Sequence, residues 1–220
     1  MVSAPLLFPL VSADVALFSV DAGKLVVLLA QRAHEPQALK WALPGAILKP
    51  DEDADLHATA CRALHEKVNV EVAYLAQVGV FSGIDRDPRG WSLSVLFYAL
   101  LPADQVKAVV KSRVEAVQWA EASGLTQSLA FDHDRQLGAA LQILRDKVER
   151  HALPLHLLPE RFTLTALQRT CEAVLGRPLD KSIFRRRLKT SDELVAIDDE
   201  FAVGSQRPAQ LYRARDGFTF

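Results

Sequence analysis

The chain has 220 residues, of which 50% are hydrophobic and 24% are charged, and its formal net charge at pH 7 is −1. This is ordinary globular composition, with enough apolar surface for one large domain or for a medium domain and a smaller one. The near-neutral balance excludes a chain that is basic throughout, so any surface for nucleic acid must be local.

The cysteines and the N-terminus exclude further classes of protein. Cys61 and Cys171 are too far apart to indicate a disulfide framework or a metal site, and each falls at an apolar helix position where a buried free thiol is expected. The first basic residue is Lys24, so the charged start of a signal peptide is missing. No apolar run is long enough to span a bilayer. We therefore expect a cytoplasmic protein without membrane contact.

The first 150 residues combine strand and helix patterns. An alternating segment at 13–20, a turn at 21–23 and a buried segment at 25–32 predict a β-hairpin. Apolar residues at four-residue spacing predict a helix from Leu56 to Val68. The other elements expected in this half are strands at 72–81 and 93–100 and a helix at 134–150.

The composition changes after residue 150. Residues 1–150 carry 15 basic and 18 acidic side chains, whereas residues 151–220 carry 11 basic and nine acidic ones. The segment 151–159 has two prolines and no clear period, as in a linker. We therefore predict two domains, 1–150 and 151–220. The elements expected in the second are a strand at 162–164, helices at 166–175 and 181–190, and strands at 194–197 and 209–214.

The segment from Trp41 to Glu52, followed by Arg62 to Asn69, resembles the Nudix box. In that signature a glycine-rich loop and a glutamate precede Arg-Glu-apolar-x-Glu-Glu-x-Gly on a helix. Carboxylates three and four residues apart lie on one helix face, where they hold divalent cations that bridge a diphosphate and activate water. The positions that this chain keeps are Gly45, Glu52, Arg62, Leu64, Glu66 and Val70.

Three positions of the box depart from the family pattern. Ala63 and Lys67 replace two of the three carboxylates, and Lys67 puts a cation where a metal would bind. Asn69 replaces the final glycine, a mild change because asparagine also adopts left-handed backbone. Nine residues separate Glu52 from Arg62, where the family has seven. We therefore expect no metal and no hydrolysis. The alternative is an ordinary amphipathic helix, which the preceding Trp-Ala-Leu-Pro-Gly turn disfavours.

A short charged loop, residues 85–91, provides candidate ligand contacts. Arg86 and Arg89 suit bidentate contacts to phosphate oxygens, and Trp91 suits stacking or packing. Asp85 and Asp87 lie beside the arginines, so a salt-bridged turn explains the same residues equally well. Local chemistry leaves both interpretations open.

Residues 162–214 have the order of a winged helix, which is two helices followed by a hairpin. Thr165 is the expected cap of the first helix, Gly176 its end, and Asp180 the cap of the second helix. The side chains expected to face the core are Leu167, Cys171, Val174 and Leu175 in the first helix and Ile183, Phe184 and Leu188 in the second.

The second helix carries a local basic surface. Residues 177–189 contain six basic side chains and one acidic one. A recognition helix needs an apolar back and a basic, hydrogen-bonding front. Arg187 borders the apolar face and is the poorer candidate. The candidate DNA-contacting residues are Lys181, Ser182, Arg185, Arg186 and Lys189 on the helix and Gln206 and Arg207 at the tip of the hairpin at 201–208.

Several motifs together resemble the NrtR family of Nudix-related transcriptional regulators. They are Trp-Ala-Leu-Pro-Gly (41–45), Asp-Arg-Asp-Pro-Arg-Gly (85–90), Leu-Ala-Phe-Asp-His (129–133), Leu-Leu-Pro-Glu-Arg-Phe-Thr-Leu (157–164), Leu-Gly-Arg-Pro-Leu-Asp-Lys (175–181) and Arg-Pro-Ala-Gln-Leu-Tyr-Arg (207–213). The resemblance implies an α+β chain, with a Nudix-like α/β/α sandwich around a mixed sheet and a C-terminal winged helix-turn-helix domain. It also implies a homodimeric repressor, usually of genes of NAD metabolism, that binds a palindromic operator.

The resemblance extends to the effector. Family members release DNA on binding ADP-ribose or a related nucleotide, although others respond to sugars, so the effector stays open. No cofactor is implied. The ligand-site residues implied are Asp14, Arg32, Arg86, Arg89 and Trp91. The alternative function is an active Nudix hydrolase of ADP-ribose or another nucleoside diphosphate derivative, with a C-terminal domain that dimerises or binds RNA.

Overall fold

The computed structural model describes residues 8–102, 105, 114–150, 152–189, 191–202 and 208–220. The N-terminal half is built on a seven-stranded mixed sheet in which the main strand order is β3-β2-β1-β6-β5. In addition, β4 pairs with β1 and β7 pairs with β2. The strands are β1 (Leu10–Asp21), β2 (Lys24–Arg32), β3 (Trp41–Ala42), β4 (Gly45–Ile47), β5 (Leu75–Gly83), β6 (Ser92–Leu100) and β7 (Val114–Glu121).

The hairpin expected at the N-terminus is confirmed, and it lies at the centre of this sheet. β1 pairs antiparallel with β2 and parallel with β6. Its buried residues alternate between two apolar clusters: Val15 and Leu17 belong to one, and Ala16 and Phe18 to the other. Because side chains alternate along a strand, a strand that is apolar on both faces must be covered on both faces.

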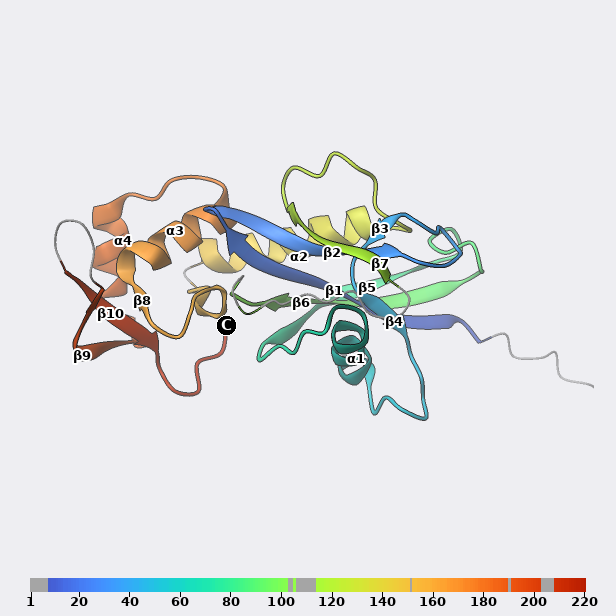
Figure 1. Cartoon of the computed structure of the whole chain (residues 1–220), viewed down its shortest axis with the longest axis horizontal. Helices are drawn as coiled ribbons and strands as arrows, with labels where there is room; N and C mark the ends of the chain where they lie inside the picture. The colour runs from blue at the N-terminus through green and yellow to red at the C-terminus, as the bar shows by residue number, and fades with distance from the viewer. Residues whose placement is uncertain (1–7, 103–104, 106–113, 151, 190, 203–207) are drawn as a thin grey trace, which may run out of the picture.

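One helix covers each face of the sheet. α1 (Leu56–Val68) belongs to the cluster of Val15, and α2 (His133–Glu149) to that of Phe18. Figure 1 shows them on opposite sides of the strands, as in an α/β/α sandwich. α1 has the predicted limits, with Asp55 as its cap and Asn69 in the left-handed conformation (φ 55°) at its end.

The C-terminal half is a winged helix, as the sequence indicates. Its elements are β8 (Phe162–Thr163), α3 (Leu164–Leu175), α4 (Lys181–Leu188), β9 (Leu194–Ala202) and β10 (Ala209–Ala214), and the order of the strands is β8-β10-β9. Asp180 caps α4 as expected, through a bond from the Ile183 N–H of 2.8 Å. Gly176 ends α3 with φ 69°.

Some local predictions are wrong. The cap of α3 is Thr163, not Thr165, because the backbone is still extended at Thr163, whose hydroxyl accepts the Ala166 N–H. β5 begins three residues later than expected, and β9 continues five residues further. Ile183 is not in the core: 60% of it is exposed, whereas Phe184 and Leu188 are buried.

The two cysteines differ in burial. Cys171 is buried in α3, and burial raises the pKa of its thiol to about 12. Cys61 is only half-buried, with its Sγ 3.7 Å from His57 Nδ1, so the expectation of a buried thiol fails there. Both are free.

The two halves share one apolar core. The segment predicted as a linker is packed: Leu153, Leu155, Leu157 and Leu158 are buried in the cluster that also holds residues of α2, α3 and α4. Leu155–Leu157 form a short 3-10 helix, η2. No helix in the described parts of the chain is long and apolar enough to cross a membrane.

Polar contacts join the far half of α2 to the winged helix. Arg145 Nε donates to the Val174 carbonyl oxygen at 3.1 Å, and Arg177 Nη2 is 2.7 Å from both carboxylate oxygens of Glu149. α2 therefore contacts the winged helix through its C-terminal turns, while its N-terminus lies at the other end of the sandwich (Figure 1).

Candidate functional site

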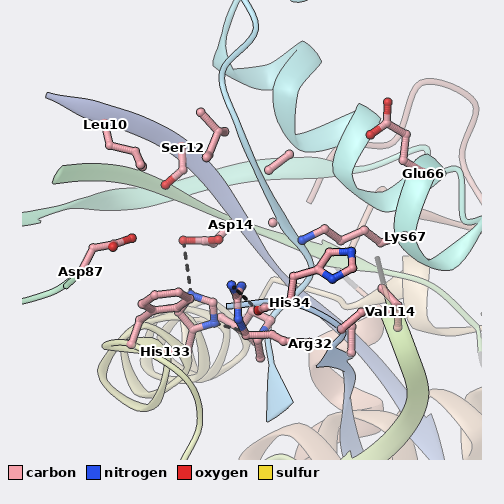
Figure 2. A pocket seen from close by; sticks show the side chains of 18 of the residues that line it. Leu10, Ser12, Asp14, Arg32, His34, Glu66, Lys67, Asp87, Val114 and His133 are labelled. Atoms are coloured by element: carbon pink, nitrogen blue, oxygen red, sulfur yellow. Dashed lines mark hydrogen bonds and ion pairs between the residues drawn. The ribbon is translucent and has the colours of Figure 1, made fainter. Parts of the chain in front are cut away.

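A cavity of about 940 Å³ opens between β1, β4, α1 and the 86–89 loop. It brings together residues from distant parts of the chain (Figure 2). The predicted ligand residues that line it are Asp14, Arg32, Arg86 and Arg89, and the residues of the degenerate Nudix box that line it are Gly45, Arg62, Glu66 and Lys67. The sequence predictions for ligand and box thus converge on one site.

Three predicted residues do not line this cavity. Trp91 is 48% exposed and lies outside the lining. Ala63 is fully buried in the core between α1 and the sheet. Glu52 is ion-paired with Lys49 at 3.0 Å.

Asp14 of β1 is a buried carboxylate of the cavity. Ser94 Oγ donates to its Oδ2 at 2.6 Å, and Gln136 Nε2 donates to the same oxygen at 3.3 Å. Gly45 is its partner across the β1–β4 ladder. A Cβ at Gly45 would overlap Asp14 Oδ1 and lie 3.0 Å from the Ala13 carbonyl oxygen. The glycine is therefore needed for the position of the Asp14 carboxylate.

His133, the first residue of α2, directs a neutral ring at Asp14. The Leu43 N–H donates to its Nδ1 at 2.9 Å, so the ring hydrogen lies on Nε2, 3.6 Å from Asp14 Oδ2. Burial lowers the pKa of His133, which keeps the ring neutral. The sequence places His133 at the end of a family motif, but its spacing predicted no role for it.

The salt-bridged turn that the sequence left open holds for Arg89, whereas Arg86 pairs with Asp132 outside the loop. Arg86 is bidentate with Asp132, through bonds of 2.9 and 3.3 Å, and lies 3.9 Å from Asp14. Although burial raises the pKa of Asp132, hydrogen bonds from Arg86 and Gln136 hold it below its usual value. Arg89 pairs with Asp87 at 2.7 Å. Each arginine is thus salt-bridged and also faces the cavity.

Arg32, at the end of β2, adds a further cation. Its Nε donates to the Pro36 carbonyl oxygen at 2.9 Å, and its guanidinium lies 4.7 Å from the centre of the Phe131 ring. Burial and the nearby Arg89 charge lower its pKa, but an arginine remains charged at pH 7. Phe131, which the sequence pattern did not single out, lines the cavity beneath it.

Arg62 of α1 is fixed by Asp53, not by Glu52. Its Nε and Nη2 donate to the two Asp53 oxygens at 2.7 Å each, and Nη2 also donates to the Ile47 carbonyl oxygen. The hydrogen bond from Arg62 holds the pKa of Asp53 far below its usual value. Glu52, which the sequence aligns with the family glutamate, pairs with Lys49 instead. The spacing between Glu52 and Arg62, which is longer than in the family, was the sequence signal that pointed to Asp53, because Asp53 is one residue closer to Arg62.

The face of α1 that corresponds to the metal-binding face of the Nudix family carries one carboxylate, Glu66, and one cation, Lys67. Glu66 is paired with Arg62 at 3.3 Å, and Lys67 extends from α1 into the cavity (Figure 2). Among the described residues there is no group of three or more His, Cys, Asp or Glu side chains that could hold a metal.

The surface of α4 is the second candidate site. Arg187 borders the core as expected, 5.9 Å from the Phe184 ring centre, and burial lowers its pKa. Arg185 is half-buried, with Nη2 3.5 Å from Thr165 Oγ1, so it points outward less than predicted. Gln206 and Arg207 lie outside the described residues. The exposed residues of α4 and its C-cap are Lys181, Ser182, Ile183, Arg186 and Lys189.

Two family models match the chain. The NUDIX domain matches residues 9–140, and the NrtR DNA-binding winged helix domain matches residues 154–214. A curated relative from Acinetobacter baylyi, named as an ADPR responsive transcriptional repressor NtrR, is 42% identical over 93% of this chain and 82% of its own length.

Solved structures extend the likeness to three dimensions. The Shewanella oneidensis NrtR in complex with a 27mer DNA matches with a TM-score of 0.83 and 33% identity, covering 93% of both chains. The NUDIX domain of the same protein complexed with ADP ribose matches with a TM-score of 0.59 and 33% identity, covering 63% of this chain and 90% of that one.

Proposed function

This chain belongs to the NrtR family of Nudix-related transcriptional regulators, and on that premise we propose that it is a DNA-binding repressor whose Nudix domain senses ADP-ribose or a related nucleotide. The carrying observation is that one chain, 42% identical to an ADP-ribose-responsive repressor, combines a cationic cavity with a winged helix whose α4 is exposed and basic. The two domains are residues 1–150 and 151–220, and the packed segment after residue 151 connects them.

The chemistry of the cavity supports a nucleotide ligand. Its volume falls in the range of small-molecule sites. Arg32, Arg86 and Arg89 supply planar guanidinium groups that suit a diphosphate, and the Asp14 carboxylate suits a ribose hydroxyl. Trp91 stays outside the proposed ligand set because it does not line the cavity.

The residues of the degenerate Nudix box argue against hydrolysis. Ala63 and Lys67 stand where the family has carboxylates, and the remaining Glu66 is paired with Arg62. The Lys67 ammonium would repel a divalent cation at short range. We propose that the domain keeps binding and has lost the metal-dependent step.

α2 supports a route from ligand to DNA-binding domain. Its first residue, His133, faces Asp14 in the cavity, and its last turns contact the winged helix through Arg145 and Glu149. A packed helix moves as a unit, so a ligand that displaces Asp14 or His133 would also displace α3 and α4.

The assembly and the cellular setting follow from the same proposal. We propose a homodimer, since a two-fold dimer presents two α4 helices to a palindromic operator. A repressor of this kind acts in the cytoplasm, where DNA is accessible. The proposed target genes are those of NAD metabolism.

Incubation with ADP-ribose and Mg²⁺ tests the proposal. The expected result is binding by calorimetry without release of AMP, together with release of DNA in a mobility-shift assay at the same ligand concentration. Turnover at the rates of an enzyme, with no DNA bound at any salt concentration, would favour the alternative of an active Nudix hydrolase.

Replacing Gly45 by alanine is expected to weaken ADP-ribose binding. The added Cβ overlaps Asp14 Oδ1, so the carboxylate must leave its position in the cavity. The expected loss in affinity, measured by calorimetry, is at least about tenfold, the equivalent of one charge-assisted hydrogen bond.

Gly138→Ala is the matched control for that variant. Gly138 is exposed on α2, and nothing lies within 4 Å of an added Cβ. The control should bind ADP-ribose normally and melt at the same or a slightly higher temperature. Unchanged affinity in a folded Gly45→Ala variant would contradict the role given to Asp14.

A further inference from the structure

Ile183 is the apolar residue on an otherwise polar face of α4. Its side chain is 60% exposed, whereas Phe184 and Leu188 on the same helix are 3% and 7% exposed. Lys181, Ser182 and Arg186 surround it and are also exposed. The core of the winged helix is complete without Ile183, because Phe184 and Leu188 pack in the cluster that holds Leu167 and Cys171.

The position of Ile183 along α4 suits a contact with base edges. It is the third residue of the helix, and the N-terminal residues of a recognition helix are those that reach bases. Ile183 and Arg186 are three residues apart, so they are neighbours on the helix surface. Arg186 can then bind a phosphate or a guanine while the isoleucine lies against the next base pair.

We propose that Ile183 reads a thymine in each half of the operator through van der Waals contact with the C5-methyl group in the major groove. The thymine methyl is the apolar feature that the major groove presents, and an aliphatic side chain recognises it. The positive neighbours of Ile183 favour DNA as the occupant of this face over an apolar partner surface. This inference rests on the proposed DNA-binding function and adds a specificity-determining residue to it.

The test uses a duplex that the full-length protein selects from a random pool. Each thymine pair of the two half-sites is replaced in turn by deoxyuridine, which lacks only the methyl group. For the wild type, deoxyuridine at one thymine position is expected to lower the affinity about fourfold per half-site, which corresponds to the burial of one methyl-sized group. The Ile183→Ala variant is expected to bind the parent duplex several-fold more weakly. Deoxyuridine at that position should no longer lower its affinity, whereas any effect of deoxyuridine at the other positions should remain.

Further variants separate base reading from a structural role. Ile183→Val keeps an aliphatic group and should keep part of the deoxyuridine effect. Ile183→Ala should keep the salt dependence of the wild type, because isoleucine neutralises no phosphate. Ile84→Ala, which removes an equally exposed isoleucine from the Nudix domain, should bind the parent duplex as the wild type does.

Three outcomes would overturn the inference. If Ile183→Ala shows the same deoxyuridine profile as the wild type, residue 183 reads no methyl group, while the DNA-binding function stands. If the variant changes the sedimentation coefficient of the free protein, Ile183 belongs to a contact between protein copies. If the wild type selects no sequence from the pool, the proposed function and this inference fall together.

Discussion

Replacing Arg62 by methionine is expected to lower the free energy of unfolding by about 3 kcal/mol at neutral pH, the lower end of the range for breaking a buried ion pair. Methionine keeps much of the aliphatic stem but leaves Asp53, whose side chain is only 2% exposed, without its cation. Asp53 retains hydrogen bonds from the Lys49 N–H and Thr59 Oγ1, which is why the lower end applies. Urea denaturation followed by circular dichroism measures the change.

The effect of Arg62→Met should depend on pH. Because the pKa of Asp53 is held far below its usual value, the pair stabilises the fold above the unfolded pKa of about 4. That contribution is lost as the pH falls below about 4 toward the folded pKa. The difference between wild type and variant should therefore be full at pH 7 and smaller at pH 3.5.

Arg161→Met is the control for this experiment. Arg161 is 2.6 Å from Glu200, a similarly short pair, but its side chain is 59% exposed. Exposed pairs contribute less than about 1 kcal/mol. Equal losses in the two variants, or a loss for Arg62→Met that is the same at both pH values, would show that burial of Asp53 does not govern the stability of this site.

Local pattern was sufficient to predict most elements of the fold. α1 has its predicted limits because Leu56, Ala60, Leu64 and Val68 recur at helical spacing and Asn69 suits the left-handed end. The predicted strand ended at residue 197 because the acidic run Asp198-Asp199-Glu200 is not typical of a strand, whereas β9 continues to Ala202. These residues belong to a strand of a small sheet with one solvated face, where charged side chains are compatible with strand structure.

The geometry of the candidate site could not be predicted from the sequence, because its side chains contact residues far away along the chain. Asp14 is bonded to Ser94 and Gln136, which are 80 and 122 residues away along the chain. Gln136 also fits an ordinary amphipathic helix, and the family motif that ends at His133 does not show that the His133 ring faces Asp14. The family motif supplied the box, but only the fold shows that Asp53 occupies the place beside Arg62.

The length of α4 explains why Ile183 was assigned to the wrong face. A helix of eight residues makes little more than two turns. With three apolar residues in so short a helix, the sequence does not decide which of them form the buried stripe. Phe184 and Leu188 are four residues apart and form the buried stripe. The aliphatic part of the Arg187 side chain packs at the edge of this stripe. From the sequence alone, Ile183 is an equally good candidate for that position.

Replacing Arg186 and Lys189 together by alanine is expected to have the largest effect on DNA binding. Arg186 of α4 and Lys189 at its C-cap are both exposed, whereas the Arg185 side chain is half-buried and contacts Thr165 of α3. Removing one cation that neutralises a phosphate should lower the slope of log K against log salt by about 0.9 and cost about tenfold in affinity at about 0.1 M salt. The double variant removes two cations from each protomer and four from the proposed dimer, so the expected fall in slope is about 3.6 and the expected loss in affinity is about four orders of magnitude. Fluorescence anisotropy over about 0.05–0.2 M salt measures both quantities.

The charge-matched control is Lys40→Ala with Arg135→Ala, which removes two exposed cations from the Nudix domain. Both double variants change the net charge equally, so a general electrostatic attraction between protein and DNA would weaken equally in the two. A direct role of α4 requires instead that the control keep the salt slope of the wild type. An equal fall in slope for both variants would mean that the basic face of α4 does not contact the phosphates. The winged helix would then bind DNA, if at all, through a different element.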